Sequence, residues 1–472
     1  MPSQLPFPVP GSSSKGTGRW YAYDFFLLVL VIFPSCFWFV YHVGPNSKQE
    51  YPNLGVTLPP NYYEWHEREN AMPQNNLNLP PPQGRRGRYV RFNNFYGNVG
   101  WGNAQQEMIM NAHIAYKSER IFTMYNYTWK KETREDYWTY ERGDKKDVVP
   151  SRIPLTALLD GPIAGGPFPV SDWRPPAVTT EFFEEVCPHP TYLNVGETKG
   201  DLQWASAATI MNGIIEKLNS IDDRCVEFVD GTGQLFDFWI FGDGPRMADI
   251  WPQLMESPIL TDWAWSDLVK SGVEHNCDLI HPFIRPNDLH RSELRGLLAL
   301  HVRRGDFETH CAMLSNWCSL PNAFNTRHDF PDKHNPPVDR TCDGNHHEAT
   351  HEYYFQHCFP TIEQIVARVE VITADAARQG RKLDRIYILT NGSKDWLGEL
   401  KIALSQVRPW LSITTSRDLD ITWEQKFVAQ AMDQLIATRA EVFVGNSWSS
   451  LSSNINLIRA ALMRDPETCR LL

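Results

Sequence analysis

From residue 88 onward, short apolar runs alternate with longer stretches in which apolar residues recur every three or four positions. The first elements predicted are a strand at Tyr89–Phe92, a glycine-rich loop at 93–102, a helix opened by Asn103, and a strand at 121–124. Short apolar runs bounded by turn residues predict buried strands, and helical spacing predicts the helix between them. This order of elements is typical of a βαβ unit, in which the strands are parallel.

A second series of alternating elements follows an apolar run at 297–302. Strands are predicted at 385–389, 411–415 and 441–444, and helices at 396–404, at 424–440 and from Ser449 or Ser450 onward. Strands that alternate with helices indicate parallel sheets, so two α/β domains are the economical interpretation. Clusters of Pro and Gly between about residues 140 and 235 predict long loops there.

The N-terminal region has a different pattern. Residues 25–43 are almost wholly apolar and approach the ~20 residues that span a bilayer, so they predict a transmembrane signal-anchor. The tail at 1–24 carries Lys15 and Arg19 and is expected to stay cytoplasmic. The rest of the chain is then lumenal, as in a single-pass type II protein of the Golgi or endoplasmic reticulum membrane. Residues 44–87 are rich in Pro, Asn and Gln and predict an extended stem.

Charge and cysteine content narrow the class of protein. A net charge of -11 argues against nucleic acid as a partner, because nucleic-acid binding leaves a basic footprint. The cysteines outside the anchor form an even set, which predicts up to four disulfides in an oxidising lumen. The His- and Cys-rich stretch from His310 to Cys358 could alternatively bind zinc. Its spacing matches no zinc pattern, so we favour disulfides within a long loop. Two sequons, at Asn126 and Asn391, permit N-glycosylation.

The most informative polar cluster follows the apolar run at 297–302. That run leads into His301, Arg303, Arg304 and Asp306. Ligands of open α/β sheets bind at the carboxyl ends of strands, and a guanidinium fork fits a phosphate or carboxylate. Side chains alternate across a strand, so only one of the two arginines can face a cleft. The alternative is a structural ion pair between an arginine and Asp306.

Two glycine-containing loops are further candidates for ligand binding. The segment Gly445-Asn446-Ser447-Trp448-Ser449-Ser450-Leu451 enters a helix and offers backbone N–H groups, hydroxyls and the positive end of the helix dipole. Ordinary helix capping is the alternative and needs only one serine. In the other loop, Gly102 permits close approach of a ligand, and Asn103 can cap the helix or hold a ligand oxygen. This loop lacks the full dinucleotide-binding glycine pattern.

Together these residues resemble the GDP-fucose protein O-fucosyltransferase family. The family has a glycine-asparagine motif, resembled by Gly100-Trp101-Gly102-Asn103, and an H-x-R-x-G motif, matched from His301 to Gly305 with Cys311 following. It also has an aspartate twelve residues before a G-N-x-x-S-S-F segment. Here Asp433 precedes Gly445-Asn446-Ser447-Trp448-Ser449-Ser450-Leu451. Leucine replaces the family's phenylalanine at position 451.

The resemblance implies a GT-B glycosyltransferase fold, in which two Rossmann-like domains face each other across a cleft. Residues 88–290 would form the acceptor side and residues 291–472 the GDP-sugar side. Arg303 would hold the β-phosphate of GDP-fucose and Asp433 the guanine, with Asn103 near the sugar or acceptor. The diphosphate would be held by Ser449, Ser450 and the amide of Leu451, in a site that also includes Gly102, His301, Gly445 and Asn446.

We therefore expect transfer of fucose from GDP-fucose to a hydroxyl of a protein or glycan acceptor, with inversion and without a metal or other cofactor. Glu107 and Asp306 are candidate bases for the acceptor hydroxyl, and each can instead be structural. Asp418 and Asp420 form a D-x-D pair that could hold a divalent ion, but we interpret them as a solvated loop. The alternatives are a non-catalytic nucleotide- or glycan-binding protein on the same scaffold, or a transferase that uses another nucleotide sugar.

Overall fold

A computed structural model describes residues 58–133, 135–142, 145–336 and 342–472. The predicted tail, the anchor at 25–43 and the first part of the predicted stem lie outside the described residues. Among the helices of the described ranges, none has the length and apolar character needed to cross a membrane. The described residues all lie within one compact unit.

The first parallel sheet is built from the N-terminal half. Its strand order is β2-β1-β9-β8, and every neighbouring pair is parallel. Its strands are β1 (Tyr89–Phe92), β2 (Ile121–Phe122), β8 (Thr191–Leu193) and β9 (Cys225–Phe228). Helix α2 (Trp101–Lys117) connects β1 to β2, which confirms the predicted βαβ unit. The helix begins two residues before Asn103, because Gly100 is its N-cap.

The second parallel sheet is built from the C-terminal half, in the order β13-β12-β11-β14-β15. Its strands are β11 (Leu294–Val302), β12 (Arg385–Thr390), β13 (Ser412–Thr415), β14 (Ala440–Gly445) and β15 (Cys469–Leu471). The helices on its faces are α14 (Ile362–Arg378), α15 (Lys394–Val407), α16 (Ala429–Arg439) and α17 (Ser450–Ala461). The predicted strands and helices of this half are confirmed, with ends that differ by a few residues.

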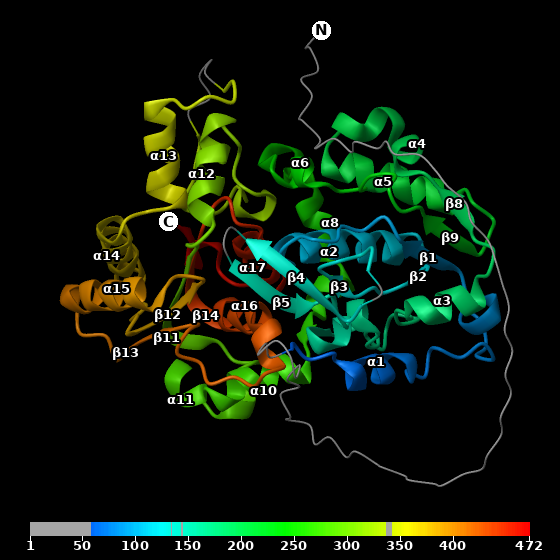
Figure 1. Ribbon diagram of the computed structural model, residues 1–472, viewed down its shortest axis with the longest axis horizontal. Helices are drawn as coiled ribbons and strands as arrows, with labels where there is room; N and C mark the ends of the chain where they lie inside the picture. Colours follow the sequence, from blue (N-terminus) through cyan, green and yellow to red (C-terminus); the bar gives the residue numbers. More distant parts are fainter. Residues whose placement is uncertain (1–57, 134, 143–144, 337–341) are drawn as a thin grey trace, which may run out of the picture. The chain divides into compact units, whose positions relative to one another are not determined.

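Alternation along the central strands divides the second sheet between two cores. Leu298 and Leu300 of β11 face the core formed with α14 and α15. Leu297 and Ala299 face the opposite way, into a core that they share with α16, α17 and α2. In Figure 1 this sheet lies between α14 and α15 on one side and α16 and α17 on the other. Because both faces are covered, the central strands β11, β12 and β14 are mainly apolar, as is typical of parallel sheets.

The remaining elements connect and flank the two sheets. The other helices are α1 (Tyr63–Asn70), α3 (Thr180–Val186), α4 (Val195–Lys199), α5 (Ala207–Asn219), α6 (Phe238–Phe241), α7 (Gly244–Met247), α8 (Trp251–Met255), α9 (Pro258–Thr261), α10 (Asp267–His275), α11 (Cys277–Ile280), α12 (Phe307–Asn316) and α13 (Glu348–Cys358). The short antiparallel pairs are β3 (Tyr127–Thr128) with β6 (Arg152–Ile153), β4 (Tyr137–Arg142) with β5 (Lys145–Pro150), and β7 (Leu159–Asp160) with β10 (Ala264–Trp265).

The described part of the predicted stem is packed, so that prediction is wrong for residues 58–87. Tyr62 is only 1% exposed and donates its hydroxyl to the carbonyl of Glu424, 2.7 Å away. Glu69 of α1 accepts hydrogen bonds from the backbone and side chain of Thr156. Contacts with partners this distant in sequence cannot be predicted from the local sequence, whereas the Pro and Asn content of residues 58–87 locally predicts an extended stem.

Disulfides confirm part of the cysteine prediction. Bonds join Cys187 to Cys225, Cys311 to Cys358 and Cys318 to Cys342. Cys277 and Cys469 are unpaired and buried, so the described residues contain three bonds and not four. Cys311 and Cys358 lie on α12 and α13, so the two ends of the predicted long loop are helices that this disulfide links.

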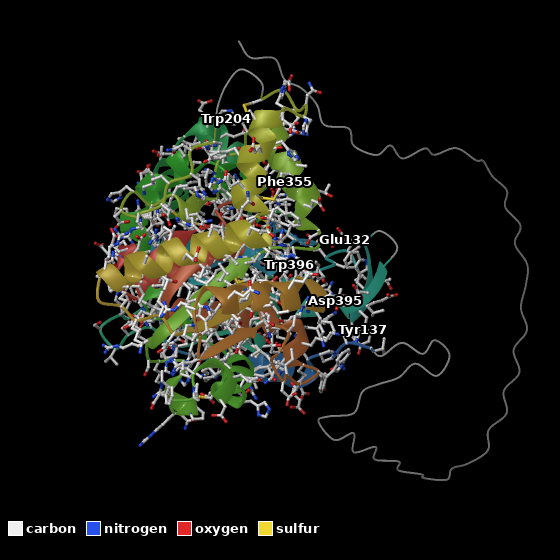
Figure 2. The ribbon with its side chains drawn as sticks, turned by 90° about the vertical axis from the view of Figure 1, so that its left-hand side faces the viewer. Glu132, Tyr137, Trp204, Phe355, Asp395 and Trp396 are labelled. Carbon is white, nitrogen blue, oxygen red and sulfur yellow. A yellow bond between two sulfur atoms is a disulfide. The ribbon has the colours of Figure 1, made fainter. Side chains whose placement is uncertain are left out.

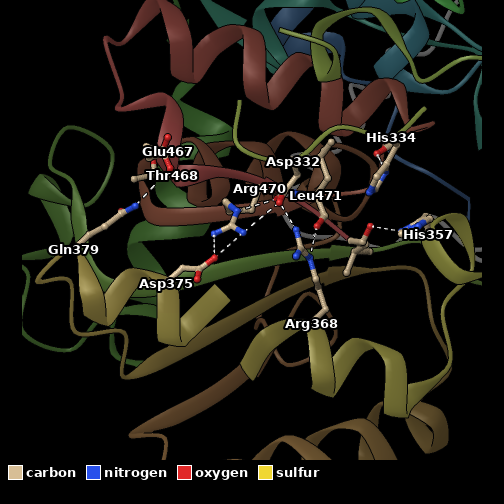
Figure 3. A network of polar contacts seen from close by, with 12 residues as sticks. Asp332, His334, His357, Arg368, Asp375, Gln379, Glu467, Thr468, Arg470 and Leu471 are labelled. Atoms are coloured by element: carbon tan, nitrogen blue, oxygen red, sulfur yellow. Dashed lines mark hydrogen bonds and ion pairs between the residues drawn. The ribbon is translucent and has the colours of Figure 1, made fainter. Parts of the chain in front are cut away.

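The C-terminal strand is held by a network of buried charges (Figure 3). Asp332 accepts from Arg470 Nε at 2.8 Å and from the Leu471 backbone at 2.9 Å, and pairs with Arg368 Nη2 at 2.5 Å. Arg470 also reaches Asp375 of α14 at 3.0 Å. Burial opposes charge on Asp332, but the bonds and ion pairs with Arg470 and Arg368 hold its pKa below the usual value. The network fastens β15 to the edge of the second sheet.

Candidate active site

One cleft of about 550 Å³ gathers most of the predicted site residues. Its lining comes from the β1–α2 loop, the turn after β11 and the start of α17. The residues that line it are Asn98, Gly100, Trp101, Gly102, Asn103, Tyr127, Trp129, His301, Arg303, Asp306, Phe307, His310, Asn391, Gln430, Trp448, Ser449, Ser450 and Leu451. The carboxyl ends of parallel strands therefore meet here, as ligand sites of open α/β sheets do.

Arg303 and Asp306 form the charged part of the wall. Arg303 Nη2 lies 3.3 Å from Asp306 Oδ2, and both side chains are about one-third exposed, at 35% and 30%. The two alternatives weighed from the sequence thus occur together: an ion pair is present, and it borders the cleft. Arginine in this position presents a planar fork of donors to any oxyanion that enters.

Arg304 points the other way and has a structural role. It is 7% exposed, and its guanidinium lies 4.2 Å from the ring centroids of both Phe359 and Trp396. Its Nη2 donates to the carbonyl of Pro360. Trp396 is labelled in Figure 2. Stacking between two rings fixes the arginine side chain, so the choice of Arg303 as the cleft-facing residue is consistent with the structure.

Two histidines line the cleft, and burial lowers the pKa of each. His301 is 3% exposed, and its Nδ1 lies 2.7 Å from Ser452 Oγ. Burial, reinforced by the positive charge of Arg303, lowers the pKa of His301 to about 3. Burial and Arg303 also lower the pKa of His310. Positive charge in this part of the cleft therefore comes from Arg303 and not from the histidines.

The start of α17 supplies a second group suited to anions. Ser449 is the N-cap residue, but its side chain makes no capping hydrogen bond. Ser452 and Ser453 are fully buried and bind other parts of the protein: Ser452 accepts from the Asn446 backbone, and Ser453 accepts from the Phe324 backbone. The serines thus divide into a structural pair and a pair, Ser449 and Ser450, that lines the cleft. A helix amino terminus with hydroxyls beside it favours bound phosphate.

Gly102 allows the two halves to meet at this helix terminus. A Cβ at this position would lie 2.6 Å from Ser450 Oγ and 2.8 Å from the Leu451 nitrogen. The Gly102 carbonyl accepts from Asn454 Nδ2 at 2.8 Å. Glycine is therefore required for close approach of α2 to α17, and the contact is within the protein. Asn103, one residue on, is exposed and lines the cleft.

Four predicted site residues do not line the cleft. Gly445 and Asn446 shape the loop before α17: Asn446 is fully buried and donates to the carbonyl of Cys358 at 2.7 Å. Glu107 is 2% exposed, accepts from the Tyr96 backbone at 2.9 Å, and has a pKa raised by burial to about 8. A base must reach the proton it removes, so this position does not support Glu107 in that role.

Asp433 is the fourth predicted site residue that does not line the cleft. Its carboxylate accepts from the Tyr387 hydroxyl at 2.6 Å and from Ser416 Oγ at 2.9 Å. Burial raises its pKa to about 6, against the opposing effect of these bonds. It lies beside the carboxyl ends of β12 and β13, at the same edge of the sheet as the cleft but outside its lining. Its contact with guanine stays a prediction.

The D-x-D pair is engaged elsewhere. Asp418 accepts from Lys401 Nζ at 2.6 Å and from the Thr415 backbone at 2.7 Å. Asp420 is 85% exposed and faces His275. Neither aspartate lines the cleft. Their positions agree with the interpretation of a solvated loop.

Sequence reasoning missed several residues of the cleft. Tyr127, Trp129 and Trp448 give it aromatic walls, and Asn391 separates it from a neighbouring hollow. The aromatic residues have no distinctive spacing, so nothing local points to them. Asn391 was assigned from the sequence only to a sequon. Its position directly after a predicted strand was the signal that could have found it.

Comparison with protein-family models indicates which class of protein has these site residues. Residues 280–462 match the sequence model described as GDP-fucose protein O-fucosyltransferase, and the match contains the turn after β11 and the start of α17. The chain is therefore a glycosyltransferase by class. The motifs predicted this likeness to the GDP-fucose protein O-fucosyltransferase family, and the match covers residues 280–462, less than half of the chain.

Solved structures and curated sequences were also compared. A crystal structure of POFUT1 in complex with GDP-fucose is 14% identical, covers 79% of this chain and 94% of that chain, and has a TM-score of 0.43. A structure of an Arabidopsis thaliana FUT1 mutant in complex with GDP is 9% identical, covers 84% and 76%, and has a TM-score of 0.37. Comparison with curated proteins found no match.

Proposed function

We propose that this chain transfers fucose from GDP-fucose to a hydroxyl of a protein or glycan acceptor, with inversion at the sugar carbon and without a metal ion. The observation that carries the proposal is the convergence of Arg303 and the start of α17 on one wall of the cleft. Both lie in the segment that matches the family.

The chemistry of transfer fits these groups. The bond between the anomeric carbon and the β-phosphate oxygen breaks, the acceptor oxygen bonds to that carbon, and the acceptor proton is lost. Negative charge develops on the departing GDP, so stabilising the diphosphate lowers the barrier most. Arg303, the hydroxyls of Ser449 and Ser450 and the backbone amide of Leu451 would do so, and all four residues line the cleft. Asp306 lines the cleft and stays the candidate base.

The proposal extends to the parts of the chain that the structure does not test. Residues 88–290 form the acceptor side, and residues 291–472 the GDP-sugar side. The apolar segment at 25–43 anchors the protein in the Golgi or endoplasmic reticulum membrane, with the catalytic part in the lumen. The three disulfides support an oxidising compartment.

Calorimetry tests donor binding directly. Purified protein is titrated with GDP, GDP-fucose, GDP-mannose and UDP, with and without a divalent metal. We expect binding of GDP and GDP-fucose in both conditions and none of UDP. Tight binding of another nucleotide sugar in place of GDP-fucose would show that the donor is not GDP-fucose. Binding of GDP-fucose with no release of GDP on any acceptor would favour a non-catalytic binding protein.

Arg303 variants test the proposed contact. Arg303→Ala should weaken GDP binding by about 10- to 150-fold, on the order of 1.5–3 kcal/mol for a charged hydrogen bond. Arg303→Lys should restore little of it, because a point charge does not replace the fork. Arg295→Ala is the matched control, since Arg295 lies near the start of the same strand and its side chain is 87% exposed. Wild-type affinity in Arg303→Ala would refute the assignment.

A further inference from the structure

We propose that Asn391 is a positioning residue of the donor site and that its sequon carries no glycan. The inference rests on the proposed function, because the group that Asn391 positions is the one assigned to the diphosphate. Asn391 directly follows β12, the neighbour of β11 in the sheet. Its side chain therefore lies beside the turn that carries Arg303 and Asp306.

The Asn391 carboxamide binds that turn through both of its polar atoms. Oδ1 accepts from the Arg304 backbone N–H at 2.7 Å, and Nδ2 donates to Asp306 Oδ1 at 3.1 Å. Asp306 uses its other oxygen, Oδ2, for the contact with Arg303 Nη2 at 3.3 Å. One amide thus holds both the backbone of the turn and the carboxylate that orients the cleft-facing guanidinium.

The turn itself is shaped around this amide. Gly305 has φ +63°, in the left-handed region that favours glycine, and a Cβ there would lie 3.1 Å from Asn391 Nδ2. Asn391 also lines both the donor cleft and the hollow formed by Lys394, Trp396 and Arg417 on its other side. It is therefore part of the wall between two cavities.

No other side chain of similar size makes the same pair of bonds. An amide has an acceptor and a donor on one planar group, whereas a carboxylate has acceptors alone. A carboxylate at this position would meet the carboxylate of Asp306 across the existing 3.1 Å contact. The repulsion would turn Asp306 away and release Arg303 from its orientation.

The same contacts conflict with glycosylation at Asn391-Gly392-Ser393. An N-linked glycan replaces one of the two hydrogens on the amide nitrogen, and this nitrogen lies 3.1 Å from Asp306 Oδ1, so the first sugar would crowd the turn. The glycan would also have to leave through the wall between the two cavities. We infer that protein folded with this donor site has an unmodified Asn391.

A matched pair of variants separates the amide from the sequon. Asn391→Asp keeps the side-chain shape and removes the donor. Ser393→Asp removes the sequon and keeps Asn391; Ser393 caps α15 through an acceptor oxygen, and aspartate supplies one too. We expect GDP to bind about tenfold more weakly to Asn391→Asp and within twofold of wild type to Ser393→Asp, by calorimetry. Circular dichroism checks that both variants fold.

A double-mutant cycle tests whether Asn391 acts through Asp306. If it does, Asn391→Ala should weaken GDP binding less when Asp306→Ala is already present than it does alone, and the remaining loss comes from the bond to the Arg304 backbone. Fully additive losses would overturn the proposal, and so would wild-type affinity in Asn391→Asp. In either case GDP binding by the wild-type protein would still support the proposed function. Failure of the wild type to bind GDP would instead overturn the proposed function.

Mass spectrometry of protein made in glycosylating cells tests the second part. The peptide that contains Asn391 should have its unmodified mass. A glycan on that peptide, in protein that binds GDP with normal affinity, would overturn the inference.

Discussion

Replacing Gly102 with alanine adds one methyl group at the contact between α2 and the start of α17. The methyl carbon would lie 2.6 Å from Ser450 Oγ, 2.8 Å from the Leu451 nitrogen and 3.1 Å from the Ser450 carbonyl carbon. The hydroxyl can rotate away, but the backbone atoms cannot. Gly102 cannot retreat either, because its carbonyl is bound to Asn454.

The size of the effect follows from two opposing contributions. Overpacking a close contact costs about 1–3 kcal/mol. Alanine in place of glycine in a helix gains at most about 1 kcal/mol, and less in the first turn. We expect Gly102→Ala to lose about 1–2 kcal/mol of folding free energy. If α17 shifts to relieve the contact, its first amides move with it, and GDP binding should weaken about tenfold, or roughly 1.4 kcal/mol.

Thermal unfolding and GDP calorimetry measure the two effects in one preparation. Gly398→Ala is the matched control, since Gly398 lies inside α15 and a Cβ there meets no atom within 4 Å. It should stabilise the protein by about 0.5–1 kcal/mol and leave GDP binding unchanged. Unchanged stability and GDP affinity in Gly102→Ala would refute the reasoning, because the methyl group would then have found room.

Two further predictions concern buried charges. Asp332→Ala should destabilise the protein by about 1.5–3 kcal/mol in chemical unfolding, because it removes the charged bonds to Arg368 and Arg470 and leaves Arg470 with Asp375 as its acidic partner. Glu132→Ala should cost under about 1 kcal/mol, since the side chain of Glu132 (Figure 2) is 68% exposed. Equal losses of stability in the Asp332 and Glu132 variants would contradict this account. Glu107 should make stability fall as pH rises from about 4.5 towards 8, because the unfolded chain ionises this carboxyl while burial keeps it protonated in the folded state. By pH 7 the loss is about 3 kcal/mol, and Glu107→Gln should abolish it in unfolding curves recorded from pH 5 to 8.

The strands and helices that could be predicted are those whose apolar spacing repeats. Residues 297–302 and 385–389 read as buried strands because both of their faces are covered, and β11 and β12 confirm them. The packing of residues 58–87 could not be predicted, since Tyr62 and Glu69 meet partners hundreds or tens of residues away. The helix α13 was missed because its sequence, rich in histidine, has no clear apolar stripe.

The candidate site divides in the same way. Arg303, Ser449 and Ser450 follow a strand or precede a helix, so their place at the edge of the sheet could be deduced, and they line one cleft. The sequence left Glu107 open between a base and a structural residue, because helical spacing does not tell which side of α2 faces the cleft and which faces the core. The role of Asn391 was missed because an asparagine in a sequon cannot be told by sequence from an asparagine whose amide positions a neighbouring turn.

The core shared by the two sheets has a consequence for how the chain can be divided. Leu297 and Ala299 of β11 pack with Met108 and Ile109 of α2 in one apolar cluster. Cutting the chain near residue 290 would leave each fragment with an uncovered apolar face, so neither half is a transferable module. A chimera that exchanged residues 88–290 for the corresponding part of another protein would have to supply a matching surface for β11 and α17. Redesign of this protein should therefore change the loops around the cleft and leave the pairing of the two halves intact.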